Sequence, residues 1–253
     1  MSLHVERAAR GPDLVMLHGW GLHSGAWDEL VPALASRARV HAIDLPGHGH
    51  SRAAAAGSFD STTDEIAGLV PEGATVCGWS LGGLFAQRLA HRHPARVARL
   101  VLVGATPCFA ARPGWPHAMQ PATLAEFATG LESNRDATLA RFVRLNAMHG
   151  AHARDAIRAF TARLGERGAP DGEALATSLG WLRETDLRAG APGLAQPTLV
   201  VHGARDMLAP VAAGRWLALH IRGARMHELP DAAHLPFFTH RDAFLAALEP
   251  FVG

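Results

Sequence analysis

The chain of 253 residues contains few cysteines and almost no net charge, and each shortage excludes a class of protein. Only Cys77 and Cys108 occur, which is too few for a disulfide framework, so we expect a reducing compartment. A net charge of +1 argues against a broad surface for nucleic acids. No apolar run is long enough to cross a bilayer, and residues 1–4 lack the apolar core of a secretory signal. These absences predict a cytoplasmic protein without nucleic-acid or membrane partners. We also expect a monomer, although the sequence carries no signal for oligomeric state.

Motifs for metals and phosphates are also missing. The sequence has no H-E-x-x-H, and the pairs His149/His152 and His48/His50 lack a third ligand. Glycine-rich loops of the Walker or dinucleotide-binding type do not occur. We therefore expect no metal and no cofactor. Hydrophobic residues make up 48% of the chain and charged residues 19%, which is typical of a folded globular protein rather than a disordered one.

Strand patterns alternate with helical patterns along most of the chain. The predicted strands are residues 3–8, 13–17, 39–43, 74–77, 99–103, 197–201 and 225–229. Five of the predicted helices are residues 27–36, 63–70, 84–91, 212–220 and 241–251. This alternation predicts an α/β fold with a doubly wound, mostly parallel sheet.

Residues 107–186 interrupt the alternation, since they contain helical segments only. These segments are residues 122–131, 135–148, 151–164 and 173–184. The insertion follows the strand at 99–103, so we expect it to cover the carboxyl ends of the strands, where ligands bind in open α/β sheets. We interpret it as a lid (cap) subdomain on a core formed by residues 1–106 and 187–253.

A serine motif lies between the strand at 74–77 and the helix that follows it. Gly78-Trp79-Ser80-Leu81-Gly82 reads G-x-S-x-G, the pattern of a nucleophile elbow. Glycines at both ends allow the tight turn, and the following helix directs its unpaired N–H groups toward the serine. The alternative is a glycine-rich turn whose serine has no special role, so the remaining parts of a catalytic site must be found elsewhere.

Serine needs a base to remove its proton, and the base needs an acid to orient it. In this architecture the acid and the histidine follow later strands, in the order Ser, Asp or Glu, His. Asp206 follows the strand at 197–201, and His234 follows the strand at 225–229. Asp186 precedes its strand, and Asp231 shares the loop of His234, so both are weaker candidates. We predict a Ser80–His234–Asp206 triad.

Acyl transfer also requires N–H donors for the oxyanion that forms on the carbonyl oxygen. The backbone N–H of Leu81, next to the candidate nucleophile, supplies one donor. The second is expected from the loop after an early strand, where His18-Gly19-Trp20-Gly21 stands. We assign the Trp20 N–H. Serine at position 80, where aspartate would favour dehalogenase or epoxide chemistry, indicates ester or thioester cleavage.

These segments together resemble the α/β-hydrolase superfamily from end to end. The motifs that carry the resemblance are His18-Gly19-Trp20-Gly21, Asp44-x-Pro46-Gly47-x-Gly49-x-Ser51, Gly78-Trp79-Ser80-Leu81-Gly82-Gly83 and the Asp206/His234 pair. A closer similarity is to the esterase family that acts on pimeloyl-acyl-carrier-protein methyl ester in biotin synthesis. It is carried by Gly78 to Leu84, Thr106-Pro107-Cys108-Phe109, Trp115-Pro116 and Thr185-Asp186-Leu187-Arg188.

The resemblance implies a serine carboxylesterase that hydrolyses the methyl ester at the far end of a carrier-bound pimeloyl chain and releases methanol. It implies a substrate-binding set of Trp20, Ser80, Leu81, Phe142, Val143, Arg144, Leu145, Asn146 and His234. It also implies that the partner, acyl carrier protein, docks on Arg141, Arg154 and Arg158.

Three alternatives stay open at this stage. The arginines can be solvated faces of arginine-rich helices. The same triad can serve a broad-specificity short-chain carboxylesterase or a C–C bond hydrolase. A ligand receptor built on a hydrolase scaffold is the non-enzymatic alternative.

Overall fold

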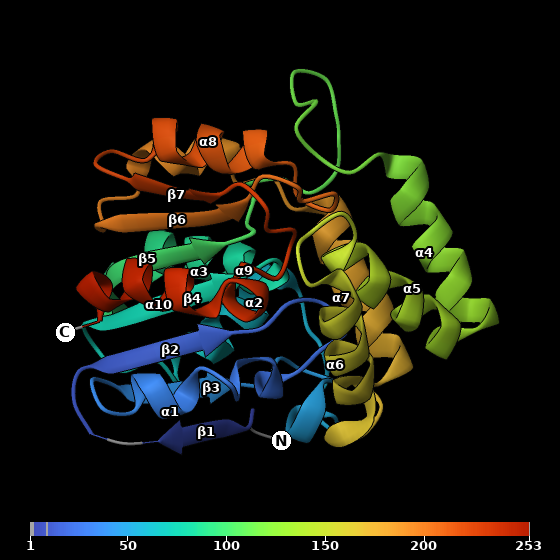
Figure 1. The fold of residues 1–253 in the computed structure, drawn as a ribbon, viewed down its shortest axis with the longest axis horizontal. Coiled ribbons are helices and arrows are strands. Elements are labelled where there is room, and N and C mark those ends of the chain that lie inside the picture. The colour runs from blue at the N-terminus through green and yellow to red at the C-terminus, as the bar shows by residue number, and fades with distance from the viewer. Residues whose placement is uncertain (1–2, 9, 253) are drawn as a thin grey trace.

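The computed structural model describes residues 3–8 and 10–252, which form one seven-stranded sheet flanked by helices (Figure 1). The strands are β1 (Val5–Ala8), β2 (Asp13–Leu17), β3 (Arg39–Ile43), β4 (Ala74–Trp79), β5 (Val97–Val103), β6 (Thr198–Gly203) and β7 (Arg225–Leu229). Their order in the sheet is β1-β3-β2-β4-β5-β6-β7. Only β1 is antiparallel to its neighbour, and the other pairings are parallel. The expected doubly wound, mostly parallel sheet is therefore confirmed.

The α-helices divide into those that cover the sheet and those that lie beyond its edge. The first group is α1 (Val31–Leu34), α2 (Phe59–Ala67), α3 (Leu81–Arg92), α8 (Val211–His220), α9 (Pro236–Thr239) and α10 (Arg241–Leu248). The second group is α4 (Pro121–Ser133), α5 (Arg135–Ala147), α6 (Ala153–Glu166) and α7 (Gly172–Glu184). Figure 1 shows this second group, here called the helical cover, at the end of the sheet toward which the β2 arrow points.

Hydrophobic packing covers both faces of the sheet, as a parallel sheet requires. Successive strand residues point to opposite faces, and β2 follows this rule: Val15 and Leu17 join one core cluster, whereas Leu14 and Met16 join the other. Among the residues that the structure describes, no helix is both long and apolar enough to cross a membrane.

Three of the predicted helices have wrong boundaries. The helix expected at 27–36 is instead a 3-10 turn, η1 (Ser24–Trp27), followed by the short α1. Pro32 lies in the first turn of α1 and has no N–H for a longer helix, so the chain cannot run helically through it. The helix expected at 63–70 begins earlier, because the Ser58 side chain accepts a hydrogen bond from the Ser61 N–H and caps α2. Pro250 accompanies the change from α10 to a 3-10 turn at the last predicted helix.

Candidate active site

Ser80 occupies the turn between β4 and α3 with φ 55° and ψ −117°, a conformation that side-chain-bearing residues rarely adopt. A Cβ at Gly78 would lie 2.2 Å from the Gly82 carbonyl oxygen, and a Cβ at Gly82 would lie 2.2 Å from the Leu17 carbonyl oxygen. The turn is therefore possible only with glycine at both positions. The Ser80 N–H donates to the Val103 carbonyl oxygen at 3.0 Å, which fixes the strained residue to the neighbouring strand.

Asp206 and His234 meet at the same edge of the sheet, although 28 residues separate them in the chain. Asp206 follows β6 and His234 follows β7, and the distance from His234 Nδ1 to Asp206 Oδ2 is 2.6 Å. The His234 N–H donates to the Asn146 carbonyl oxygen at 2.9 Å, and the Trp79 indole N–H donates to the His234 carbonyl oxygen at 2.9 Å. The helical cover and the elbow strand thus both hold the histidine in place.

The electrostatics of this pair suit a base that accepts a proton on its outer nitrogen. Burial by itself would raise the pKa of Asp206, but the electrostatic attraction to His234 and the close contacts with His202 and His234 outweigh it and hold that pKa below its ordinary value. Asp206 is therefore a carboxylate, and His234 carries its proton on Nδ1. Within residues 3–8 and 10–252, His234 Nε2 is buried and has no hydrogen-bond partner, the Ser80 hydroxyl included. Such bonds commonly tighten when substrate binds.

His202 is a polar neighbour of Asp206 that the sequence analysis did not single out. It lies in β6, is completely buried, and brings Nε2 to 2.7 Å from the Ala209 carbonyl oxygen and 3.4 Å from Asp206 Oδ2. The backbone N–H groups of Leu208 and Ala209 both donate to Asp206 Oδ1 at 2.9 Å. The signal available in the sequence was the four-residue spacing of His202 and Asp206 at the end of a strand.

The two residues assigned to the oxyanion hole are near Ser80: Leu81 follows it in the chain, and Trp20 lines the same cavity. Leu81 is the first residue of α3, and neither its N–H nor that of Trp20 donates to another group in the part of the chain that the structure describes. The Trp20 indole N–H donates instead to the Leu175 carbonyl oxygen of α7 at 3.1 Å. A positive φ of 73° at Gly21 turns the chain after Trp20.

A narrow apolar cavity opens on Ser80 beneath the helical cover. Its lining residues are Trp20, Ser80, Phe109, Met119, Leu124, Phe127, Phe142, Leu179, Leu182 and Leu208. Helices α4, α5 and α7 each contribute side chains to it. The free space is about 10 Å³, which is room for about one water molecule. The wall is apolar, as an acyl chain requires, but in this conformation the free space is too small to hold one.

The side chains of residues 142–146, which are expected to line the acyl chain, do not all face the cavity. Phe142 lines the cavity, where its ring lies 4.8 Å from that of Trp20 between ring centroids. Val143 packs into the second core cluster, Arg144 is exposed and Leu145 is half-buried. Asn146 is buried, and its side-chain amide donates to the Phe142 carbonyl oxygen at 2.7 Å. A helix rotates about 100° per residue, so five consecutive residues cannot share one wall.

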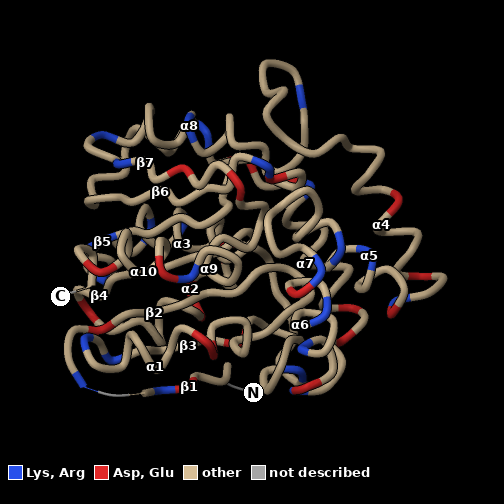
Figure 2. Tube along the Cα trace, in the orientation of Figure 1, with Lys and Arg blue, Asp and Glu red and all other residues tan. Residues whose placement is uncertain are grey.

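The three arginines assigned to carrier docking have different surroundings on the helical cover. Arg141 on α5 pairs with Glu126 at 2.7 Å, and Arg158 on α6 pairs with Asp155 at 2.9 Å. Arg154 is exposed and forms no ion pair with any described residue. Figure 2 shows acidic and basic residues interspersed along α4 to α7, so the helical cover is not a surface of one sign.

The two weaker acid candidates pair with arginines instead of with His234. Asp186 is exposed and pairs with Arg188 at 2.6 Å, and Asp231 is exposed and pairs with Arg205. Both carboxylates are thus engaged at the surface.

Comparison with known proteins agrees with this geometry. Residues 12–241 match the alpha/beta hydrolase fold family. The pimeloyl-acyl-carrier-protein methyl ester esterase of Chromobacterium violaceum is 44% identical over 248 residues, which cover 98% of this chain and 97% of that protein. The protein of the same name from Nitrosomonas europaea is 42% identical over 249 residues, which cover 98% of each chain.

Similarity to a solved structure supports the fold alone. An esterase from Exiguobacterium antarcticum superposes with a TM-score of 0.89 at 24% sequence identity, and the match covers 99% of this chain and 95% of that chain. Both the sequence matches and the structural match therefore extend over nearly the full length of the chain.

Proposed function

This chain belongs to the α/β-hydrolase fold family, and we propose that it is a serine carboxylesterase that hydrolyses the methyl ester of pimeloyl-acyl-carrier protein in biotin synthesis. The observation that carries the proposal is the combined site: a strained Ser80 facing an apolar cavity, with a buried histidine–carboxylate pair at the same sheet edge. We infer the substrate from the names of the relatives that are more than 40% identical over nearly the whole chain.

In the first half of the reaction, the Ser80 hydroxyl oxygen attacks the ester carbonyl carbon while His234 Nε2 accepts its proton. Asp206 stabilises the imidazolium through the 2.6 Å contact at Nδ1. The backbone N–H groups of Trp20 and Leu81 donate to the oxyanion. The C–O bond to the methoxy group then breaks, and His234 returns the proton so that methanol leaves and an acyl-enzyme remains.

In the second half, water attacks the acyl-enzyme carbonyl carbon and His234 accepts one of its protons. The bond to the Ser80 oxygen breaks, and the proton passes back to the serine. The product carries a free carboxylate at the end of the acyl chain. No cofactor is required, because the triad and the oxyanion donors supply every proton and charge contact of both steps.

We assign residues 107–186 as a lid on a core of residues 1–106 and 187–253. Phe142 is the acyl-chain contact that the cavity supports directly. Val143, Arg144, Leu145 and Asn146 remain proposed substrate contacts that require a rearranged lid, since this conformation buries or turns them away from the cavity. The cytoplasm is the proposed location, because both cysteines are free and buried.

We assign the docking of acyl carrier protein to Arg154 and Arg158, one helical turn apart on α6, together with Arg141 on α5. The exposed Arg154 has the most freedom to pair with an acidic carrier. A complementary local field mainly raises the rate of encounter.

The deciding experiment compares hydrolysis of pimeloyl-acyl-carrier-protein methyl ester with hydrolysis of a panel of simple methyl, ethyl and p-nitrophenyl esters. The proposal requires a much higher kcat/KM on the carrier-linked ester. Similar values across the panel would favour a broad-specificity carboxylesterase instead. A fluorophosphonate label that reacts with the parent but not with Ser80→Ala tests the nucleophile.

Docking is tested by Arg154→Glu combined with Arg158→Glu. We expect kcat/KM on the carrier-linked ester to fall at least about tenfold, while simple-ester hydrolysis is retained. A matched control reverses the same number of charges at the exposed Arg222 and Arg225, near the start of β7 and remote from the helical cover. Equal losses in both double variants would contradict the assigned docking surface.

A further inference from the structure

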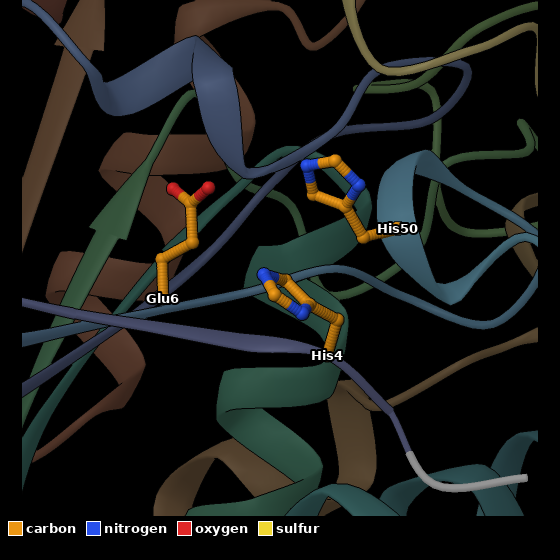
Figure 3. Close-up of side chains that lie close together, drawn as sticks. All are labelled: His4, Glu6 and His50. Carbon is orange, nitrogen blue, oxygen red and sulfur yellow. The ribbon is translucent and has the colours of Figure 1, made fainter.

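Three metal-ligating side chains meet outside the candidate active site, where β1 borders the loop after β3. One ligand atom from each of His4, Glu6 and His50 lies within 4.8 Å of the other two. Figure 3 shows the three side chains close together, with both imidazole rings extending toward the side on which Glu6 lies. His50 had no third ligand in the sequence pattern, and the antiparallel pairing of β1 with β3 supplies the missing partners.

Backbone contacts hold these side chains in place. The His4 N–H donates to the Ser51 hydroxyl at 2.7 Å, and the His4 carbonyl oxygen accepts from the Asp44 N–H at 3.1 Å. The His50 N–H donates to Asp44 Oδ2 at 2.9 Å. His4 and Glu6 are two residues apart on an extended chain, so they project from the same face. The backbone positions of the three candidate ligands are therefore already set by contacts within the folded protein.

His4 carries a polar atom that lacks a partner. Its Nε2 is buried and makes no hydrogen bond within the described ranges, residues 3–8 and 10–252. Leaving a buried acceptor unpaired costs about 1–3 kcal/mol. The His4 and His50 rings lie 4.8 Å apart between ring centroids in an edge-on arrangement. A metal ion bound at Nε2 would satisfy the unpaired nitrogen.

Glu6 is also held from the other side. Arg167 Nη1 donates to Glu6 Oε1 at 2.7 Å, which orients the carboxylate. Hydrogen bonds to a ligating carboxylate are a normal part of metal sites. The positive charge of Arg167 lowers the affinity for a cation, so binding is weaker than in a structural zinc site with thiolate ligands.

We propose that His4, Glu6 and His50 bind a divalent transition-metal ion, zinc above all, with water in the remaining position. Two histidines and one glutamate are an established zinc-binding set. Ligand atoms in a tetrahedral zinc site lie about 3.3 Å apart, given bonds of about 2.0–2.1 Å. The set must therefore close by at most about 1.5 Å, and rotation of the exposed His50 side chain would supply this movement.

The bound ion would connect the edge strand β1 to the loop that carries Asp44 and Gly47. That loop contacts the helical cover directly, because the Asp171 N–H at the start of α7 donates to the Gly47 carbonyl oxygen at 2.8 Å. The site would thus stabilise the fold, and the triad chemistry does not depend on it.

The test measures ZnCl₂ binding to the chelator-treated full-length protein by calorimetry and follows Tm with and without zinc. We expect one zinc per chain and a rise in Tm, both lost in His50→Ala and in Glu6→Gln. His91→Ala, which removes an exposed histidine from α3, is the matched control and should bind zinc as the parent does.

Cobalt(II) provides a second readout, since its visible absorption bands report tetrahedral coordination by nitrogen and oxygen. The proposal is overturned if the parent binds no zinc, or if His50→Ala and Glu6→Gln bind it with the parent's stoichiometry and affinity. Hydrolysis of a simple ester by each variant confirms that the variants are folded.

Discussion

Replacement of His18 should make the protein less sensitive to acid. His18 is completely buried at the end of β2, with Nδ1 at 2.8 Å from the Gly19 carbonyl oxygen and Nε2 accepting from the Leu45 N–H at 2.9 Å. This pattern fits only the neutral ring, since a proton on Nε2 would face the Leu45 N–H. Burial, followed by repulsion from His48, lowers the pKa of His18 from 6.5 to about 3.

The sign of the effect follows from proton counting. Because the folded-state pKa is lowered, the unfolded chain binds more protons below pH 6.5, and stability falls as the pH drops from 6.5 toward 3. A histidine that stays neutral in the folded state costs about 2 kcal/mol of unfolding free energy between pH 7 and pH 5. Burial also lowers the pKa values of His23 and His48, which adds to the loss in the same direction.

The assay is urea unfolding of the parent and of His18→Asn at pH 7, 6 and 5. The variant retains a donor for the Gly19 carbonyl oxygen, loses the Leu45 contact, and should be less stable at pH 7 by about 1–3 kcal/mol. Its further loss on going to pH 5 should be smaller than the parent's by about 2 kcal/mol. The exposed His91→Asn serves as control and should follow the parent. Parallel losses in the parent and His18→Asn would refute the reasoning, as would an NMR titration of His18 above pH 5.

Three further predictions concern the candidate site. His202→Leu removes the buried contact to Asp206 and should lower kcat by about 10–100-fold with little change in KM. An unchanged kcat would show that the backbone N–H groups position Asp206 without help from His202. Gly82→Ala places a Cβ 2.2 Å from the Leu17 carbonyl oxygen and should lower the free energy of unfolding in urea by about 1–3 kcal/mol. It should also abolish nearly all ester hydrolysis, and a variant with parental activity would disprove the close approach. Phe142→Ala should cost about 3–5 kcal/mol and raise KM more for long acyl esters than for acetates, so equal KM changes would place the acyl chain elsewhere.

The sequence predicted the sheet and the three triad candidates because each rests on a local pattern. A strand followed by a loop serine, aspartate or histidine is readable in a short window, and parallel strands bring their carboxyl ends to one edge whatever the details of packing. Ser80, Asp206 and His234 could therefore be placed at one edge without coordinates. The assignment of Trp20 and Leu81 as oxyanion donors rests on the same rule and stays a prediction.

Features that depend on side-chain direction could not be predicted in this way. The contact between His202 and Asp206 requires knowledge of which way a buried ring turns. The resemblance implies that Phe142 to Asn146 line the acyl chain together, yet the rotation of the helix places these side chains in different surroundings. The meeting of His4 with His50 depends on the pairing of an edge strand, which no short sequence window contains.

The closed cavity beside Ser80 has a thermodynamic consequence for substrate selection. If α4, α5 and α7 must separate before an acyl chain can enter, the apparent affinity for substrate falls in proportion to the fraction of molecules that are open. An open population of about 1% would weaken binding of a free ester by about a hundredfold. A partner that binds the outer surface of these helices only when they are apart would restore the lost affinity. Discrimination between a tethered and an untethered ester can thus arise from the work of opening, with the same atoms touching the ester in both cases.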